Sequence, residues 1–333
     1  MKAVLCKEFG PPEKLVLEEL PTPEPKPGEV LLEVHACGVN FPDVLIIQDK
    51  YQFKPPLPFA PGGEVAGVIK ALGDGVTGLS VGDRVIGSTG WGGMAEEIVV
   101  EAPRITKIPS EMDFVTASAF LMTYGTSHYA LKHRGHLKAG ETLLVMGAAG
   151  GVGLAAVELG KVMGAKVIAA ASSDEKVGIA KEHGADEGLV YPSGSLDRGQ
   201  QKEFSEQIKA LSGGQGADVV YDPVGGDYAE PALRATNWEG RYLVIGFAAG
   251  DIPRVPLNLA LLKGCDIVGV FWGAYTGRNP EEHRENVQEL MRWYTEGKLK
   301  PHVSAIYPMD KAADAINDLM HRRAKGKVVV TTR

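Results

Sequence analysis

The sequence contains few cysteines, and no two of them lie close together. Cys6, Cys37 and Cys265 are the three cysteines among 333 residues, and none belongs to a CxxC pair. This distribution excludes a zinc-finger spacing and suits a reducing compartment. We therefore expect the three thiols to behave as small, buried apolar side chains.

Long apolar runs and an excess of positive charge are also absent. No window approaches the roughly 20 apolar residues that a membrane-spanning helix needs, which predicts a soluble, cytoplasmic protein with no membrane partner. The formal net charge is -7, whereas nucleic-acid binding draws mainly on clustered Lys and Arg. We therefore expect no nucleic-acid partner.

The chain shows two different sequence patterns, one before and one after about residue 120. Up to about residue 108, apolar runs such as "EVLLEVHACGV" and "EVAGVIKALG" are separated by Gly and Pro, which is typical of short strands and tight turns. From Thr123 onwards strands alternate with helices, which predicts a parallel sheet covered on both faces. The final strand, helix and strand, ending in "GKVVVTTR", can complete the first unit. The predicted fold class is α/β, with a doubly wound Rossmann domain over 123–296 and a β-rich domain over 1–122 with 297–333.

A glycine-rich segment, "MGAAGGVG", follows a predicted strand and opens a predicted helix. Aligned to G-x-G-x-x-G it places Ala148, Gly150 and Gly153 at the three motif positions. This is the context of a dinucleotide fingerprint, in which the pyrophosphate rests on the helix N-terminus. The alternative is a tight strand-to-helix turn without a ligand. The residues expected to hold the cofactor here are Ala149, Gly150, Gly151, Val152 and Gly153.

The end of the next strand lacks the acid that usually binds the ribose 2′-hydroxyl of NAD. Ala171 occupies that place, followed by Ser172 and Ser173, with Lys176 further on. Hydroxyls and a lysine suit a 2′-phosphate, so NADPH is the predicted cofactor. Alternatively, Ser173 caps the following helix and Lys176 is solvated. Tyr191 could add another donor to the cofactor, or be an ordinary surface tyrosine.

Six segments together carry a resemblance to a known family. They are "GEVLLEVHACGVNFPD", "PGGEVAGVI", "VGDRV", "TYGTSHYAL", "AAGGVG" and "GKVVV". The whole chain resembles the medium-chain dehydrogenase/reductase superfamily, and specifically its zinc-free, zeta-crystallin-like quinone oxidoreductase branch. The resemblance implies that the β-rich unit is a GroES-like catalytic domain.

Two positions that hold zinc ligands in the metal-dependent members of this superfamily differ here. Asn40 stands where those members have Cys, and Gly63 stands where they have His. Three protein ligands normally form a catalytic zinc site, so we expect no metal; Glu64 persists in a supporting role. Gly63 is expected to leave open space beside the cleft. "HRGH", at 133–136, is expected to consist of solvated or capping histidines.

The resemblance implies that Asn40 and Tyr51 are cleft residues. The Asn40 amide could donate to an oxyanion or to the cofactor, or Asn40 could simply occupy a turn. Tyr51 could donate a hydrogen bond or stack on a planar ring, or pack half-buried. Asp43 is expected to order its turn. Thr123 and Tyr124 are expected to face the nicotinamide.

Three aromatic residues lie at predicted strand ends, where open α/β sheets bind ligands. Phe247, Phe271 and Trp272 could therefore pack around the nicotinamide or the substrate, although aromatic residues at such positions are more often part of the core.

The expected activity is metal-independent transfer of hydride from NADPH to a quinone, because a conjugated acceptor spreads the incoming charge without a Lewis acid. An enone, 2-alkenal or enoyl-thioester acceptor is the alternative. A non-catalytic NADPH-binding protein, crystallin-like or RNA-binding, is an alternative of another class. The family resemblance also implies a homodimer that pairs the strands near "DIVGVFWG".

Overall fold

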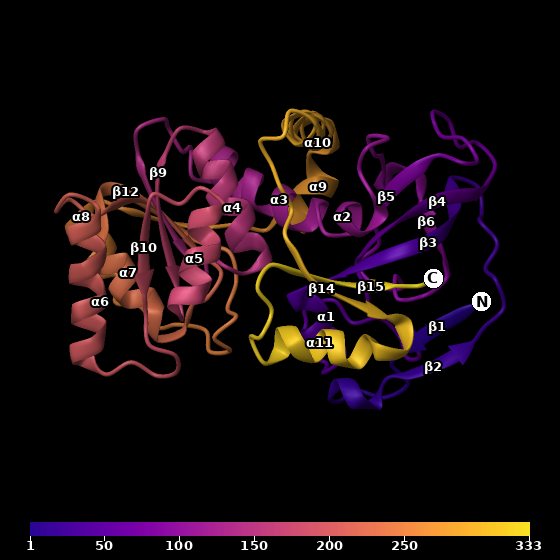
Figure 1. Cartoon of the computed structure of the whole chain (residues 1–333), viewed down its shortest axis with the longest axis horizontal. Helices are drawn as coiled ribbons and strands as arrows, with labels where there is room; N and C mark the ends of the chain where they lie inside the picture. Colours follow the sequence, from indigo (N-terminus) through magenta and orange to yellow (C-terminus); the bar gives the residue numbers. More distant parts are fainter. The chain divides into compact units, whose positions relative to one another are not determined.

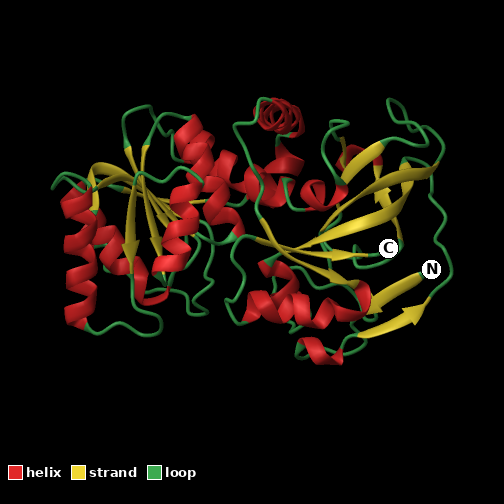
Figure 2. Cartoon of the chain, viewed as in Figure 1, coloured by secondary structure: helices red, strands yellow, loops and turns green.

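The chain divides into two compact units in the computed structural model, which describes all 333 residues (Figures 1 and 2). Unit 1 comprises Met1–Met122 and Pro301–Arg333, and unit 2 comprises Thr123–Lys300. The chain passes between the units twice, first within helix α3 (Leu121–His128) and again after Lys300. The second passage lies slightly beyond the expected boundary at residue 297.

Unit 1 is built on a seven-stranded sheet in the order β14-β15-β3-β4-β5-β7, with β6 also pairing with β3. The long strand β3 alternates side chains between the two faces, and Val30, Leu32 and Val34 lie in the buried core. The strands are β3 (Glu29–Val39), β4 (Glu64–Leu72), β5 (Arg84–Ser88), β6 (Glu97–Glu101), β7 (Ile105–Lys107), β14 (Val303–Pro308) and β15 (Lys327–Thr331), with β1 (Lys2–Leu5) and β2 (Val16–Glu19) in a separate pair.

Three short helices complete unit 1, namely α1 (Phe41–Ile46), α2 (Phe114–Ser118) and α11 (Ala312–Met320). The C-terminal strand β15 pairs antiparallel with β3, with Val328 opposite Val39. Helix α11 packs against β14, β15 and α1. The final strand, helix and strand thus join the first unit, as the sequence pattern predicted.

Unit 2 carries a six-stranded, wholly parallel sheet in the order β10-β9-β8-β11-β12-β13. This is the order of a doubly wound dinucleotide fold, whose reversal point lies between β8 and β11. The predicted fold class is confirmed. The strands are β8 (Thr142–Met146), β9 (Lys166–Ala171), β10 (Glu187–Val190), β11 (Ala217–Asp222), β12 (Thr236–Val244) and β13 (Asp266–Gly269).

Helices cover both faces of this sheet, as Figure 1 shows. Alternate side chains explain the two layers, because Leu143 and Val167 lie close to Gly160 of α4, whereas Leu144 and Ile168 join the core that includes Phe204 of α6. The helices are α4 (Gly151–Val162), α5 (Asp174–Glu182), α6 (Arg198–Leu211), α7 (Ala229–Arg234), α8 (Asn258–Lys263), α9 (Trp272–Arg278) and α10 (Pro280–Thr295), with a π-helical segment at Tyr129–Arg134. None of the chain's helices combines the length and apolar character needed to cross a bilayer.

Candidate functional site

The glycine-rich segment forms the loop between β8 and α4, at the reversal point of the sheet. A Cβ atom at Gly153 would lie 2.2 Å from the carbonyl oxygen of Gly147, so only glycine allows this close approach of helix to strand. Gly150 has an extended backbone and precedes the first helical residue, Gly151. The amide groups of the first turn lack helical acceptors, so the loop presents N–H donors suited to a pyrophosphate.

The end of β9 supplies hydroxyls and an ammonium group but no carboxylate. Ala171 is buried and apolar. The hydroxyl of Ser173 accepts the N–H of Lys176 at 3.3 Å and so caps α5. The Nζ of Lys176 lies 3.4 Å from the Oγ of Ser172. Ser173 is therefore a cap, as one interpretation held, while Lys176 is directed to the serine pair. These donors fit a nicotinamide dinucleotide that carries a 2′-phosphate.

Tyr191 is not a surface tyrosine. Its ring is buried, packs edge-on against Phe204 with centroids 5.7 Å apart, and lies 4.7 Å from the ring of Tyr228. The backbone N–H of Tyr191 donates to the carbonyl of Ala171. Tyr191 therefore ties the end of β10 to the end of β9 and supports the serine pair from the core.

The turns after β11 and β12 meet beside the glycine-rich loop. The carboxylate of Asp222 accepts the N–H groups of Val224 and Gly225 at 2.7 and 3.0 Å, which fixes the turn after β11. A Cβ atom at Gly147 would lie 2.9 Å from the side chain of Val224, and one at Gly225 would lie 2.9 Å from the ring of Phe247. Phe247 thus packs at the carboxyl edge of the sheet, where sequence reasoning located it.

The two aromatic residues after β13 have different surroundings. Phe271 is 48% exposed. Trp272 is buried, with its indole ring close against Gly125 of α3 and edge-on to His283, 5.6 Å between centroids. The structure therefore makes Trp272 a packing residue between α3 and α10, which is the core alternative, rather than an exposed aromatic surface for a nicotinamide.

Helix α3 carries the two residues that were expected to face the nicotinamide. Thr123 is buried at 2% exposure. The hydroxyl of Tyr124 donates to the carboxylate of Glu158 at 2.8 Å, and burial followed by this carboxylate raises the pKa of Tyr124 well above its usual range. The expectation for Tyr124 is wrong, because its side chain points into the interior of unit 2.

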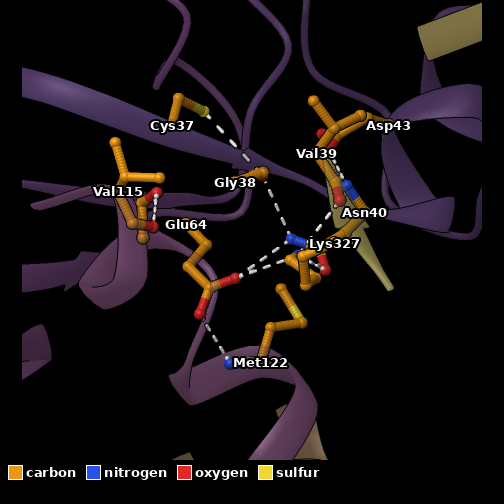
Figure 3. Close-up of polar contacts among 10 residues, drawn as sticks. Cys37, Gly38, Val39, Asn40, Asp43, Glu64, Val115, Met122 and Lys327 are labelled. Carbon is orange, nitrogen blue, oxygen red and sulfur yellow. Dashed lines mark hydrogen bonds and ion pairs between the residues drawn. The ribbon is translucent and has the colours of Figure 1, made fainter. Parts of the chain in front are cut away.

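In unit 1, four polar side chains from β4, β15, helix α1 and the residue that precedes α1 form a buried cluster, which we call the polar cluster (Figure 3). Its members are Asn40, Asp43, Glu64 and Lys327. Strand register brings them together, because β3 pairs with both β4 and β15, with Gly38 opposite Glu64. A Cβ atom at Gly38 would lie 1.9 Å from the carbonyl oxygen of Ser118, so this strand position also requires glycine.

The Asn40 amide is fully engaged inside the polar cluster. Its Nδ2 donates to the Gly38 carbonyl and to the Glu64 carboxylate, each at 3.2 Å. Its Oδ1 accepts from Nζ of Lys327 at 2.6 Å. Asn40 begins the turn into α1 with an ordinary extended backbone, φ of -127°, so no unusual backbone angle accounts for an asparagine here. Because both amide protons are used, Asn40 is not a free donor to an oxyanion in this arrangement.

The two carboxylates of the polar cluster have different partners. Glu64 accepts the N–H of Met122 at 2.8 Å and lies 3.5 Å from the Lys327 ammonium. Burial raises the pKa of Glu64, and Lys327 lowers it less. Asp43 accepts the N–H groups of Asn40 and Gly62, and burial raises its pKa to about 6. Asp43 therefore orders its turn, as expected.

The two positions that hold metal ligands in zinc-dependent relatives have lost their ligand chemistry in different ways. At one, the amide of Asn40 is bonded to an ammonium group. At the other, a Cβ atom on Gly63 would lie 3.1 Å from the carbonyl oxygen of Gly90, so the expected open space beside Gly63 is wrong. No group of three or more His, Cys, Asp or Glu side chains is arranged to hold a metal ion.

Tyr51 lies beyond helix α1 and is half-buried against the core of unit 1. Its ring packs edge-on against Phe53, 5.8 Å between centroids. Burial, and then the charge of Asp43, raise the pKa of the Tyr51 hydroxyl, so it stays protonated and able to donate a hydrogen bond.

Two features escaped the sequence reasoning. The segment "GKVVV" gives no role to Lys327, because its partner Glu64 is 263 residues away along the chain. The histidines of "HRGH" are not all solvated, since Nε2 of His133 lies 3.1 Å from Oδ1 of Asn286. No local pattern signals either contact.

Comparison with known proteins agrees with this arrangement. Residues 26–110 match the family model of the alcohol dehydrogenase GroES-like domain, and residues 151–296 match that of the zinc-binding dehydrogenase. A quinone oxidoreductase-like protein 2 homolog of Nematostella vectensis is 41% identical over 336 residues, covering 100% of this chain and 89% of the relative. The human quinone oxidoreductase is 34% identical, covering 99% of this chain and 97% of the relative.

Solved structures give the same picture. A mycobacterial protein in complex with NADPH has a TM-score of 0.91 and 32% identity, covering 99% of each chain. The CurK enoyl reductase has a TM-score of 0.87 and 26% identity, covering 99% of this chain and 98% of that one. The chain thus belongs to the quinone oxidoreductase branch of the medium-chain dehydrogenase/reductase superfamily and is an oxidoreductase with a nicotinamide cofactor.

Proposed function

We propose that the protein is an NADPH-dependent, metal-independent reductase whose acceptor is a quinone. The observation that carries the proposal is the loss of the Cys and His zinc ligands, replaced by an amide bonded to Lys327 and by a glycine, together with the Ser172–Lys176 pair beside Ala171. The names of the relatives in this branch support a quinone as the acceptor.

The bound cofactor would supply a hydride, so that quinone and NADPH, with one proton from solvent, give hydroquinone and NADP⁺. The chain's own residues bind and orient the cofactor and the acceptor. The first turn of α4 would hold the pyrophosphate, and Ser172 and Lys176 would bind the 2′-phosphate. The protonated hydroxyl of Tyr51 donates to the oxygen on which negative charge develops. The polar cluster holds the segment before α1 rigid.

The cofactor preference has a direct test in NADPH and NADH titrations, read by nicotinamide fluorescence. NADPH should bind more tightly, and Lys176→Ala should weaken NADPH by about tenfold while leaving NADH within about twofold, because it removes a charge-assisted contact with the 2′-phosphate. Ala171→Asp should reverse the preference, because a carboxylate repels phosphate and binds the 2′-hydroxyl. Equal affinities of the wild-type protein for the two cofactors would refute this part.

The acceptor is tested by a turnover screen with NADPH and 1,4-benzoquinone, 1,2-naphthoquinone, a 2-alkenal and crotonyl-CoA. We expect the quinones to be reduced fastest. Faster reduction of the alkenal or the thioester would establish the second candidate, which the likeness to an enoyl reductase favours. Inactivity towards every acceptor would leave the non-catalytic alternative, and failure to bind AU-rich RNA at physiological salt would exclude its RNA-binding form. Stoichiometric zinc in elemental analysis would overturn the metal-independent mechanism.

We also propose a homodimer formed through β13, the edge strand of the parallel sheet. An exposed edge with apolar side chains is a template for pairing, and Ile267 of β13 and Phe271 beside it are both exposed. Light scattering should give twice the chain mass for the wild-type protein and a monomer for Ile267→Lys. A monomeric wild type would refute the proposal.

A further inference from the structure

A buried carboxylate lies in the middle of α4, outside the proposed site. Glu158 is 5% exposed, in a helix stretch otherwise dominated by small and apolar residues, "GLAAVELG". Both of its oxygens are occupied. Oε2 accepts the hydroxyl of Tyr124 at 2.8 Å and the N–H of Lys300 at 2.9 Å, and Oε1 lies 2.5 Å from Nδ1 of His183. We call these four residues the Glu158 hub.

The partners of Glu158 belong to the segments that carry the cofactor-binding residues. Tyr124 follows Thr123 on α3, directly after the first passage between the units, and Lys300 is the last residue before the second passage. His183 is the C-terminal cap of α5, the helix that Ser173 caps at its other end. Glu158 itself lies on the helix that begins at the glycine-rich loop. One side chain therefore joins α3, α4, α5 and the end of unit 2.

A second contact fastens α3 to the start of α4. The hydroxyl of Ser127 donates to the carbonyl of Val152 at 3.0 Å, and its oxygen lies 2.8 Å from the hydroxyl of Tyr221. Tyr124 and Ser127 are three residues apart and share one face of α3. Thr123 is thus held relative to the glycine-rich loop by polar contacts at two levels of α4.

A buried carboxylate with three hydrogen bonds is not expected to stabilise the fold more than apolar side chains would. A buried charge must be compensated by hydrogen bonds, and apolar side chains of similar volume are often as stable or more so. The directional bonds of a carboxylate instead fix distances and orientations between segments. Three directions are used here, each to a different segment.

We propose that Glu158 is a positioning residue for the reductase reaction, which sets α3 with Thr123, and α5 with Ser173 and Lys176, relative to the glycine-rich loop. The effect on turnover rests on the proposed function. The effect on cofactor binding does not, because it is measured without an acceptor.

Two substitutions each remove one arm of the hub. Tyr124→Phe deletes the bond to α3 alone, and we expect kcat to fall about fivefold, with the dissociation constant of NADPH within about twofold of wild type. His183→Phe deletes the bond to α5, and we expect NADPH to bind about fivefold more weakly while NADH changes less than twofold, since only NADPH carries the 2′-phosphate that α5 binds. Fluorescence titration gives both constants.

The matched controls lie on α4. Glu158→Gln should keep both parameters near those of wild type, because its carbonyl can accept from Tyr124 and Lys300 and its NH₂ lies beside Nδ1 of His183, whereas Glu158→Leu should show both defects. Lys161 lies one helical turn after Glu158, and Lys161→Gln removes its ion pair with Asp186. This variant should change neither kcat nor the dissociation constant of NADPH.

The proposal would be overturned if His183→Phe weakened NADPH and NADH binding equally. It would also be overturned if Tyr124→Phe left kcat unchanged or His183→Phe left the dissociation constant of NADPH unchanged. If no acceptor is reduced at all, the proposed function fails by itself. The α3 arm is then read from hydrogen exchange, with faster exchange over residues 121–128 expected in Tyr124→Phe with NADPH bound, and unchanged exchange counting against it.

Discussion

Replacing Lys327 by Met removes the one ammonium group of the polar cluster. Nζ of Lys327 is bonded to the carbonyl of Val39 at 3.0 Å and to Oδ1 of Asn40 at 2.6 Å, and lies 3.5 Å from Oε2 of Glu64. The side chains of Lys327 and Glu64 are 6% and 1% exposed. The substitution would leave Glu64 as a buried charge held only by two hydrogen-bond donors, and would leave two acceptors unpaired.

The magnitude follows from the separation and the burial. At 3.5 Å and an effective dielectric constant of about 20, the attraction is about 5 kcal/mol, offset by the cost of removing both charges from water. Deleting one partner of a buried pair therefore costs about 3–5 kcal/mol of unfolding free energy. An exposed pair is worth about 1 kcal/mol or less. Lys311→Met, which breaks an exposed contact with Asp314, is the matched control.

The penalty should depend on pH with a defined sign. Burial raises the pKa of Glu64, and Lys327 opposes that rise, so Lys327→Met raises the pKa further. Below this raised pKa the carboxyl group of the folded state is protonated and neutral. The destabilisation should therefore be largest at pH values above the raised pKa and smaller below it, where only the lost hydrogen bonds remain.

Urea titration followed by hydrogen exchange in β3 and β15 measures this unfolding free energy for unit 1 separately. Glu64→Gln combined with Lys327→Met removes both charges and should be more stable than Lys327→Met alone. A loss below about 1 kcal/mol, a loss independent of pH, or an additive double substitution would refute the reasoning.

Two further predictions concern the same region. Gly62→Ala should destabilise unit 1 by about 2 kcal/mol or more, because φ is +99° and the added Cβ would lie 2.5 Å from Sγ of Cys37. The control is Gly75→Ala, where φ is +78° but no atom lies within 4 Å, and which should lose about half as much stability in thermal unfolding. Equal losses in the two variants would contradict the steric argument. Asp43→Asn should flatten the pH dependence of stability between about pH 4 and 6. Burial raises the pKa of Asp43 to about 6 in the folded state, so the wild type is stabilised by this group at low pH and loses that contribution as pH rises. The melting temperature of Asp43→Asn should therefore approach that of wild type as pH increases, and a gap that widens with pH would reverse the sign.

The sequence was most informative where function depends on local backbone chemistry. The glycine-rich loop, the serine pair and the order of strands and helices all follow from short patterns, because a strand-turn-helix unit and its glycines are adjacent along the chain. The lost ligand chemistry of Asn40 and Gly63 is equally visible, since it concerns the identity of single residues.

The sequence was least informative where side chains meet across the fold. No residue near Asn40 indicates that Lys327 will donate a hydrogen bond to the amide oxygen of Asn40. Likewise, "GLAAVELG" does not indicate that Glu158 will form hydrogen bonds to α3, to the end of α5 and to Lys300. The burial of Tyr191 depends on rings from α6 and from the segment before α7. The expected space at Gly63 is filled by the turn at Gly90. Each of these outcomes depends on packing between distant elements.

The strand order of unit 1 has a consequence for the sequence of events during synthesis. β15 lies between β14 and β3, so the sheet that begins with β3 is completed only by strands after Pro301. Unit 2, by contrast, is continuous and can fold as soon as Lys300 has left the ribosome. Until β15 is made, one edge of β3 is paired only at Glu29–Glu33, by β6, so residues Ala36–Val39 have no partner on that edge, and Glu64 lacks the ammonium group of Lys327. The nascent chain therefore exposes this part of β3 from the time β3 is made until β15 follows, and a chaperone that shields it would act in that interval.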